Sequence, residues 1–565
     1  MKGWILRYST FFVSYLITAL DMLIILCRNL IIIIMRKKLI VLLGLGLLAS
    51  ANLKAQTAQD FKQTYADLSV FEDPMALILK KGIKKKQLNQ IADTTLRRVA
   101  QSILDGNYNK DYKYATYYAL LNPTTLGHQL SIGDGYSKYE NMTGVYLPKG
   151  KHIVIVDGIA AGKEVNLVVP NWLRKAPNPQ EPTKDPKGWG LEKQEFRLQN
   201  GVNIIQLDDY GSLAYIDYFS EEPEKENPIR VHFPTGQVNG YFDLKKQGNK
   251  EWDSLIDHAV FPIMDAKGEH IQTAYPIEAL KQYAYGKGVE LIRNYDSLVY
   301  RQHRLMGLEK YNKVPKNRIL ARVNYNYYMF RDGDGVAYMG DKVGYAMKMV
   351  VTPESVIKGD PCWGFSHEVG HVHQTRPMFN WGGLGEVSNN LFSLYVTRSF
   401  GNKTRVSEQN NFEKAKTNII EKRISYLSDP DVFDRLIPFW QLQLYFEGEG
   451  KRSDFYADLF EAFRQQNMNK ARRQRSDWSS DRMMGERNPA VHQLNFVKTA
   501  CEVAKLDLTD FFDKYGFFFV GTLEYDDYGK YTYTLTREMV DACRLAIKNM
   551  NLPKPKIDLT TLKDR

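Results

Sequence analysis

The sequence predicts an α+β multidomain protein with a β-sandwich-like N-terminal module, a mixed domain and a mainly helical C-terminal subdomain. Three observations predict this class. The chain of 565 residues is too long for one hydrophobic core. The spacing of apolar residues changes from a helical period to an alternating one and back. Glycine, proline and aspartate separate the short alternating runs, which is typical of strands joined by turns.

These changes of pattern divide the chain into five segments. We expect a signal or targeting region at 1–55, a helical lead-in at 56–127, the β-sandwich-like module at 128–249, a catalytic domain at 250–400 and a helical subdomain at 401–565.

The amino terminus predicts export. Met35 and the three basic residues after it precede the apolar run Leu39–Ala49, and Ala49-Ser-Ala51 is a cleavage site of small residues, as in a secretory signal. We expect translation to start at Met35 and the protein to be periplasmic, on the cell surface or secreted. In the alternative, the apolar run from Phe11 to Cys27 is an N-terminal membrane anchor, which is the one membrane association predicted.

The helical lead-in and the β-sandwich-like module are each predicted from the spacing of apolar residues in short runs. Apolar residues recur every three or four positions from Leu88 to Leu104, which favours a helix. Runs such as His152–Val156, Val165–Val169 and Val202–Leu207 favour strands. A β-sandwich accounts for them, and it either binds glycans or merely packs against the next domain.

The apolar spacing of the remaining segments predicts the helices and strands of the catalytic domain and of the helical subdomain. We expect helices at 277–308, 412–427, 455–465 and 494–505. The runs Arg322–Phe330 and Val343–Val351 favour strands ahead of the most informative motif of the chain.

That motif is Ser366-His-Glu-Val-Gly-His-Val-His-Gln374. Residues four apart lie on one face of a helix, so His367 and His371 can present their imidazoles to a single metal ion. Catalytic zinc commonly takes two His and one Glu, and Glu386, fifteen residues later, is the best-placed third ligand. Glu368 is expected to act as the general base that takes the proton of the attacking water.

Chance does not explain the motif. Ten His in 565 residues give about 0.01 expected pairs of the form His-Glu-x-x-His. The alternative is a buried amphipathic helix whose histidines are satisfied by hydrogen bonds, and the downstream Glu386 makes it less favoured.

Neighbouring residues have expected roles of their own. Asn390, one helical turn after Glu386, is expected to hydrogen-bond a ligating His, with Asn389 as the alternative. His373 points away from the metal face and is expected to be packed or hydrogen-bonded. Cys362 is expected to be a small buried side chain and not a ligand.

The run from Cys362 to Gln374, together with Gly385 to Val396, resembles the enhancin-like zinc metallopeptidases, family sixty of the metallopeptidases. The resemblance extends more weakly over about 130 to 520. One departure is Phe365-Ser366, where the family usually has another aromatic residue or a proline. The resemblance implies a gluzincin-type domain with one Zn²⁺ on His367, His371 and Glu386 and with Glu368 as base.

The same resemblance implies a substrate. Members of the family include mucin-degrading enzymes, so it implies a glycoprotein or mucin-like O-glycosylated polypeptide, with glycan contacts. In gluzincins an edge strand ahead of the metal helix often pairs with the extended substrate, and 338–350 is our candidate; a core strand without substrate contact is the alternative. The sequence predicts no particular substrate-binding residue. Two further alternatives are a general endopeptidase without glycan requirement and a glycan- or host-surface-binding protein with a protease-like domain.

The net charge does not require a nucleic-acid partner, and we expect none. The formal charge is +11, and the basic residues of 1–55 account for more than half of it. The net charge of about +5 that remains is a mild excess for a chain of this size, typical of a solvated surface of mixed charge.

Overall fold

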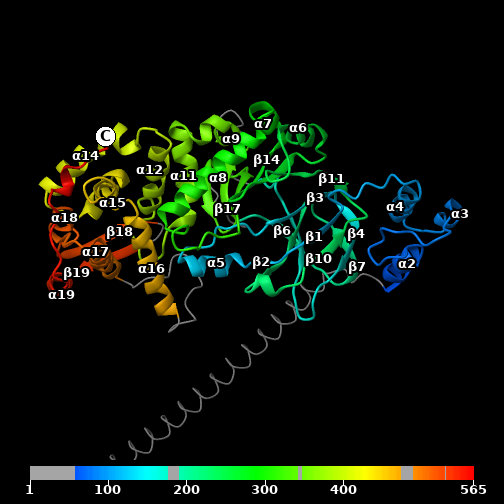
Figure 1. Ribbon diagram of the computed structural model, residues 1–565, viewed down its shortest axis with the longest axis horizontal. Helices are drawn as coiled ribbons and strands as arrows, with labels where there is room; N and C mark the ends of the chain where they lie inside the picture. Colours follow the sequence, from blue (N-terminus) through cyan, green and yellow to red (C-terminus); the bar gives the residue numbers. More distant parts are fainter. Residues whose placement is uncertain (1–57, 176–189, 341–345, 472–487, 528–529, 565) are drawn as a thin grey trace, which may run out of the picture. The chain divides into compact units, whose positions relative to one another are not determined.

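The computed structural model (Figure 1) describes five stretches of the chain: residues 58–175, 190–340, 346–471, 488–527 and 530–564. The chain divides into two compact units, Met1–Asp67 and Leu68–Arg565. In the first unit, helix α2 (Ala58–Leu68) accounts for the described residues. The predicted signal and the alternative anchor lie outside the described residues. Among the helices that are described, none is long and apolar enough to cross a bilayer.

The second unit begins with two short helices, α3 (Lys85–Leu88) and α4 (Thr94–Leu104). Asp93 starts α4 because its carboxylate accepts the backbone N–H groups of Thr95 and Leu96 at 2.8 and 2.9 Å. The helix predicted from Leu88 therefore begins six residues later.

Two antiparallel sheets follow and share one apolar core. The first has the order β1 (Tyr114–Tyr117), β10 (Ile229–His232), β4 (Gly150–Asp157), β7 (Gly201–Leu207). The second has the order β11 (Gln237–Val238), β3 (Asn141–Leu147), β8 (Ser212–Asp217), β5 (Asn166–Pro170), β6 (Lys193–Arg197). Side chains from both sheets, such as Val145, Val154 and Ile216, are buried in that core. The β-rich part thus extends upstream of residue 128 to Tyr114.

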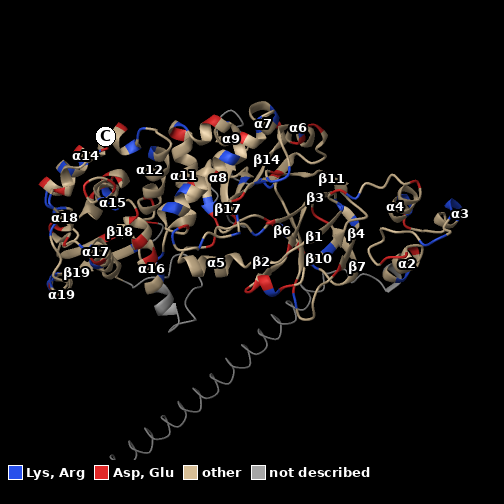
Figure 2. Ribbon diagram, in the orientation of Figure 1, with Lys and Arg blue, Asp and Glu red and all other residues tan. Residues whose placement is uncertain are grey.

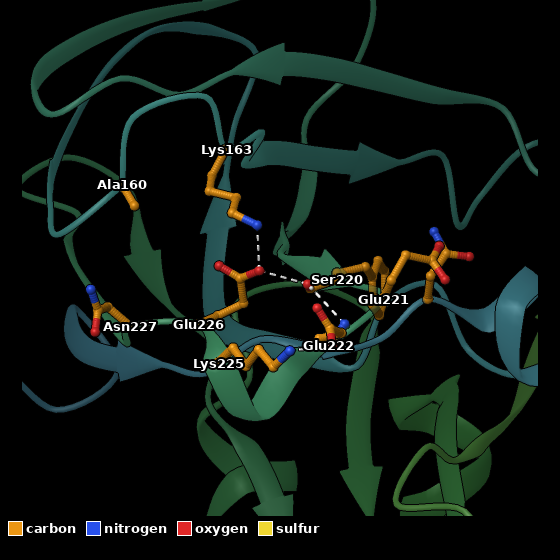
Figure 3. A pocket seen from close by; sticks show the side chains of 10 residues that line it. Ala160, Lys163, Ser220, Glu221, Glu222, Lys225, Glu226 and Asn227 are labelled. Carbon is orange, nitrogen blue, oxygen red and sulfur yellow. Dashed lines mark hydrogen bonds and ion pairs between the residues drawn. The ribbon is translucent and has the colours of Figure 1, made fainter.

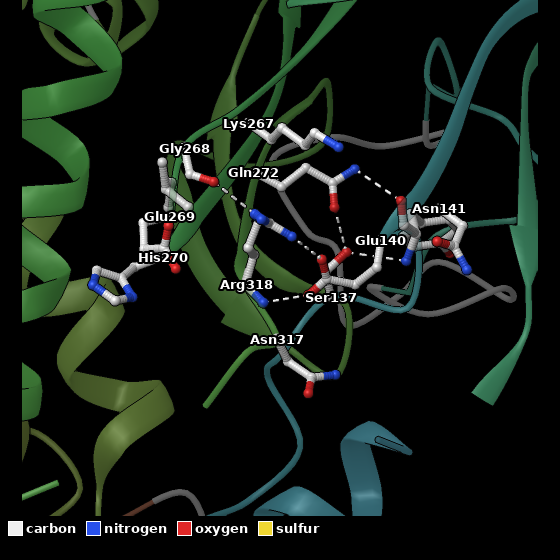
Figure 4. A network of polar contacts seen from close by, with 12 residues as sticks. Ser137, Glu140, Asn141, Lys267, Gly268, Glu269, His270, Gln272, Asn317 and Arg318 are labelled. Atoms are coloured by element: carbon white, nitrogen blue, oxygen red, sulfur yellow. Dashed lines mark hydrogen bonds and ion pairs between the residues drawn. The ribbon is translucent and has the colours of Figure 1, made fainter. Parts of the chain in front are cut away.

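Figure 4 shows how the segment before β3 is tied to the next sheet. Glu140 is buried and accepts the backbone N–H and the guanidinium of Arg318, the latter at 3.0 Å. Ser137 donates to the side chain of Gln272 at 2.7 Å, and Gln272 donates to the carbonyl of Tyr139 at 3.0 Å. A buried charge needs such a partner, so these contacts hold the linking segment against the sheet.

The central sheet is mixed and has six strands. Their order is β12 (Tyr241–Asp243), β13 (Ile263–Lys267), β14 (Ile271–Pro276), β15 (Ile319–Asn324), β17 (Gly335–Met339), β16 (Met329–Asp332). The pairs β12/β13, β14/β15 and β15/β17 are parallel, and β13/β14 and β16/β17 are antiparallel. Because β12 starts at Tyr241, this sheet begins slightly before residue 250, where the sequence analysis placed the start of the domain.

Helices pack around this sheet. They are α5 (Pro123–Leu130), α6 (Asn249–His258), α7 (Ile277–Tyr283), α8 (Gly288–Leu305), α9 (Ala346–Val351), α10 (Pro353–Val356), α11 (Gly359–His373) and α12 (Ser388–Ser399). The mixed α+β character predicted from the sequence is confirmed.

The C-terminal part is largely helical but contains a hairpin that was not predicted. Its α-helices are α13 (Arg405–Glu408), α14 (Asn411–Ala415), α15 (Val432–Glu447), α16 (Phe455–Ala471), α17 (Ala490–Ala504), α18 (Thr509–Lys514) and α19 (Arg537–Lys548). Strands β18 (Gly521–Asp526) and β19 (Lys530–Leu535) pair antiparallel. Aromatic rings fill the core here: Phe379 contacts both Phe439 and Phe496. Figure 2 shows both charge signs interspersed over these helices.

Candidate metal centre

Helix α11 carries the His-Glu-x-x-His motif and is largely buried. Phe365, Val369 and Val372 are almost fully shielded from solvent, which explains the apolar residues around the motif. Gly370 lies where α11 meets α12: a Cβ there would approach the carbonyl oxygen of Asn389 to 2.5 Å. Glycine in the motif therefore lets the two helices approach closely enough to share one site.

The structure brings His367, His371 and Glu386 together. Nε2 of His367 lies 3.2 Å from one carboxylate oxygen of Glu386, and Nε2 of His371 lies 3.5 Å from the other. One ligand atom from each of the three residues lies within 4.8 Å of the others. Side-chain exposures of 13%, 15% and 30% leave the cluster open to solvent, chiefly at Glu386.

These residues fit a zinc ion. Zinc bonds of about 2.0–2.2 Å in a tetrahedron place ligand atoms about 3.3 Å apart, close to the two separations from Glu386. Two neutral imidazoles and a carboxylate are also a common donor set of catalytic zinc, which keeps its fourth position for water or substrate. The predicted ligand set is thus geometrically competent.

Asn390 orients His367 as the sequence predicts. Nδ1 of His367 lies 3.0 Å from Oδ1 of Asn390, and Nδ2 of Asn390 donates to the carbonyl of Glu386 at 2.8 Å. Because an amide oxygen only accepts, Nδ1 carries the proton and Nε2 is left to bind metal. One side chain therefore fixes the first ligand and the backbone of the third.

Gln374 orients His371 as Asn390 orients His367. The sequence analysis gave Gln374 no role. Its Oε1 lies 3.0 Å from Nδ1 of His371, while its Nε2 donates to the carbonyl of Gly385 at 2.8 Å and to Ser388 at 2.9 Å. Its place one turn after His371 is the sequence signal that could have identified it.

Asn389 contacts both rings. Its Nδ2 lies 3.1 Å from Nδ1 and 3.3 Å from Nε2 of His367, and 3.0 Å from Nε2 of His371. Its Oδ1 is buried and accepts no hydrogen bond from the residues that the structure describes. The buried amide is thus close to the atoms expected to hold the metal, and its oxygen remains available to a further donor.

Glu368 lies between the two histidines on α11 and is 4% exposed. Burial raises its pKa, the charges of His367 and His371 lower it and the charge of Glu386 raises it, with a net increase. A carboxylate with a raised pKa accepts a proton more readily, which suits a general base.

The ligands are electrostatically coupled. Burial alone would raise the pKa of Glu386, but hydrogen bonds and charges from His367 and His371 outweigh it and hold this pKa well below its usual range. Burial lowers the pKa of His367, yet the contacts with Glu386, Glu368 and Asn390 produce a net increase. The carboxylate is therefore ionised, as metal ligation requires.

The C-terminal hairpin supports the loop that carries Glu386. Asp527, after β18, accepts the backbone N–H groups of Gly383 and Gly385 through one oxygen, at 2.8 Å each. Arg435 of α15 donates to the carbonyl of Gly383 at 3.2 Å and lies over the ring of Tyr525. The loop is thus held just before the third ligand by a contact more than 140 residues away in sequence.

Two residues expected not to be ligands are placed as predicted. His373 is fully buried; its Nδ1 lies 2.7 Å from the amide oxygen of Gln302 and its Nε2 3.3 Å from the hydroxyl of Tyr136. Cys362 is buried and forms no disulfide with any cysteine in the described part of the chain.

The candidate substrate-pairing edge at 338–350 is wrong. Tyr338 and Met339 belong to β17, which is paired with β15 on one side and β16 on the other. Residues 346–351 form helix α9 rather than the predicted strand, and 341–345 lie outside the described part. The edge strand beyond β17 is β16, and Met329 of this strand lies beside Gly364 of α11. The predicted strand Arg322–Phe330 is likewise divided between β15 and β16 by a turn.

Comparisons with known proteins identify a family segment and similar folds. Residues 238–516 match the family described as peptidase M60, enhancin and enhancin-like. A metallopeptidase from Bacteroides thetaiotaomicron is similar in fold, with a TM-score of 0.73 and 23% identity, over 91% of this chain and 83% of that chain. A metallopeptidase solved in complex with Tn antigen has a TM-score of 0.67 and 23% identity, over 81% of each chain.

A sequence relative is similar over a shorter part. TRPM8 channel-associated factor 3 from Rattus norvegicus is 24% identical over 288 residues, 49% of this chain. The chain spans 29% of the length of that relative. The matched family segment contains the central sheet, α11, Glu386 and α12. Residues 238–516 of the chain therefore belong to the peptidase M60 family, enhancin and enhancin-like.

Proposed function

We propose that this protein is an exported zinc endopeptidase that cleaves the polypeptide of O-glycosylated, mucin-like glycoproteins. The observation that carries the proposal is the convergence of His367, His371 and Glu386 with the buried carboxylate of Glu368 beside them. A binding protein has no chemical need for a general base next to a metal site.

The roles of the residues derive from their positions. A bound zinc ion would polarise the scissile carbonyl and make water more acidic. Glu368 takes a proton from the attacking water and returns it to the leaving amine. Asn390 and Gln374 keep the Nδ1 protons of His367 and His371 on the far side of the rings.

Substrate binding is proposed at β16 (Met329–Asp332). This strand ends the central sheet and lies next to α11. An extended peptide that adds to such a strand gains main-chain hydrogen bonds and is aligned along the metal helix. In this proposal β16 replaces the segment 338–350 that the sequence favoured.

Family membership and the fold support the substrate class. One structural neighbour was solved with Tn antigen, a ligand of that protein. For this chain we propose a peptide carrying an O-linked sugar, with no nucleic-acid partner. Export, through the signal predicted from Met35 onward, is part of the proposal because such substrates are extracellular.

The test is cleavage of an O-glycosylated polypeptide and its enzymatically deglycosylated twin, with fragments identified by mass spectrometry. We expect cleavage of the glycosylated form only, and loss of cleavage on chelation of zinc. Glu368→Gln should retain zinc and lose cleavage by at least about 10³-fold, since the base is removed while the ligands stay.

Glu290→Gln, an exposed change on α8, is the control and should be fully active. Equal cleavage of both substrates would replace the proposal with a general endopeptidase. Full activity of Glu368→Gln would refute the assigned base.

A further inference from the structure

The β-rich part of the protein contains several surface hollows, and they differ in how their charges are compensated. In the hollow of Figure 3, Lys163 pairs with Glu226 at 2.6 Å and Lys225 pairs with Glu222. Acidic residues are visible beside β2 (Leu120–Leu121) in Figure 2. Both lysines of that hollow are thus paired, and Glu221 adds one further negative charge.

A second hollow, the cationic hollow, lies between α4, the loop after it and the first sheet. Its volume is about 550 Å³. Its lining includes the cations Arg98, Lys113 and Lys151 and the amides Asn107, Asn109 and Gln237, and no Asp or Glu lines it.

Two of the cations lack an anionic partner. The ammonium of Lys113 is half-buried and makes no ion pair or hydrogen bond to any residue that the structure describes. Arg98 donates to the carbonyl of Thr94 at 3.3 Å, a neutral acceptor. Burial and the charge of Arg98 lower the pKa of Lys113, so the two cations repel each other across the hollow.

The imidazoles of this region add no charge. Burial lowers the pKa of His232 to about 4, and its nitrogens lie 2.7 Å from the hydroxyl of Tyr108 and 2.6 Å from the carbonyl of Met75. Burial also lowers the pKa of His152, whose Nε2 lies 2.6 Å from the carbonyl of Pro148. Both rings are neutral at pH 7.

The carboxylates at the ends of α4 are engaged elsewhere. Asp93 caps the first turn of the helix, and Asp105 accepts the amide of Gln101 at 2.7 Å. Neither lines the hollow. An anion from outside the protein is therefore the natural partner of Lys113 and Arg98.

The volume of the hollow and its other lining groups indicate which kind of molecule carries this anionic group. A volume of about 550 Å³ is in the range of small-molecule sites and far exceeds an inorganic ion. Side-chain amides of Asn107, Asn109 and Gln237 offer donors and acceptors suited to sugar hydroxyls.

We propose that the cationic hollow binds an acidic saccharide, with its carboxylate or sulfate group held by Lys113 and Arg98. The choice of a saccharide rests on the proposed glycoprotein substrate, but the site is separate from the metal centre. It would hold the glycan of a substrate or of a surface while the peptidase acts elsewhere.

The test measures binding of the full chain to 3′-sialyllactose, a 3′-sulfated lactose, neutral lactose, inorganic sulfate and a hexaglutamate peptide by calorimetry at low salt. We expect the two acidic saccharides to bind and to weaken as salt is added. Lys113→Gln and Arg98→Gln should each weaken that binding about tenfold.

Lys110→Gln, an exposed change of the same charge in the same loop, is the matched control and should bind as the parent does. Without ligand, the melting temperature of Lys113→Gln should be at least that of the parent, since the change removes a repulsion. It should also cleave a neutral O-glycopeptide normally, which separates this inference from the proposed catalysis.

Binding of lactose, sulfate or the peptide as tight as that of the acidic saccharides would overturn the inference. So would equal losses in Lys110→Gln and Lys113→Gln, or a failure of both acidic saccharides to bind a chain that cleaves glycopeptide.

Discussion

At the scale of single residues, the metal centre depends on side chains that bind no metal themselves. Asn390 and Gln374 each contact one ligating histidine and also the loop around Glu386. Each amide therefore links ligands that come from different elements. Their effect on the metal should be measurable without any change in the ligands.

Asn390→Ala tests this role. Without Oδ1, His367 loses the acceptor that fixes its Nδ1 proton, so we expect zinc affinity to fall about 10- to 100-fold. Competition with a chromophoric chelator measures the affinity. Asn390→Asp should restore much of it, because a carboxylate also accepts from Nδ1. Unchanged affinity in the alanine variant would show that packing alone orients the ring.

At the scale of elements, the site is formed where α11, α12 and the hairpin β18–β19 meet. The two helices bring the ligands close, and the hairpin fixes the loop between them. The helix contact and the hairpin contact depend on different residues, so substitutions can separate their contributions to the site.

Gly370→Ala should separate α11 from α12. The new methyl group would meet a backbone oxygen at 2.5 Å, and we expect a loss of about 1–3 kcal/mol of stability together with weaker zinc binding. Gly364→Ala on the same helix is the matched control, since its Cβ would meet Met329 at 3.8 Å, an ordinary contact. The control should be neutral or gain up to about 1 kcal/mol. Thermal unfolding of both variants decides the question, and equal losses would contradict the close-approach argument.

Asp527→Ala tests the hairpin. The change leaves the N–H groups of Gly383 and Gly385 without their acceptor, so Glu386 should lose its fixed position and zinc should bind about tenfold more weakly. Asp526→Ala, at the exposed neighbouring position, should leave zinc affinity unchanged. A parallel loss in both variants would mean that the hairpin acts only through general stability.

At the scale of the whole molecule, local patterns in the sequence predicted the motif residues, whereas contacts between residues far apart in the sequence were not predicted. His367, Glu368 and His371 were identifiable because a helix places residues four apart on one face. Asp527 was not, because its contact with Gly383 and Gly385 depends on the tertiary fold. The alternating Tyr and Thr of 530–535 next to a turn could still have indicated the hairpin.

The strand predicted at Val343–Val351 was wrong for a physical reason as well. Val343–Val351 is a short apolar run, and such a run fits a strand or a buried helix equally well. Residues 346–351 form α9, whose buried side chains face the core. Periodicity over nine residues could not distinguish the two, so the position of the sheet edge had to come from the pairing of β16 with β17.

One buried carboxyl group links the two β-rich layers and makes stability depend on pH. Asp265 of β13 accepts the hydroxyl of Tyr215 of β8 at 2.8 and 2.7 Å, and Trp172 donates to that hydroxyl at 3.0 Å. Burial raises the pKa of Asp265 to about 7, although the hydrogen bond from Tyr215 lowers it. The folded protein thus holds this proton more tightly than the unfolded chain, whose Asp has a pKa of about 3.9.

The free energy of unfolding should therefore decrease as pH rises from about 4 to about 7 and should change no further through this group above that range. Asp265→Asn keeps an acceptor for Tyr215 but carries no titrating proton, so this decrease should be absent. The stability of the variant relative to the parent should rise over the same range by up to about 4 kcal/mol. Melting temperatures of both proteins from pH 4.5 to 8 measure this difference. Parallel curves would show that Asp265 does not titrate in this range, since every other ionisable group is common to the two proteins.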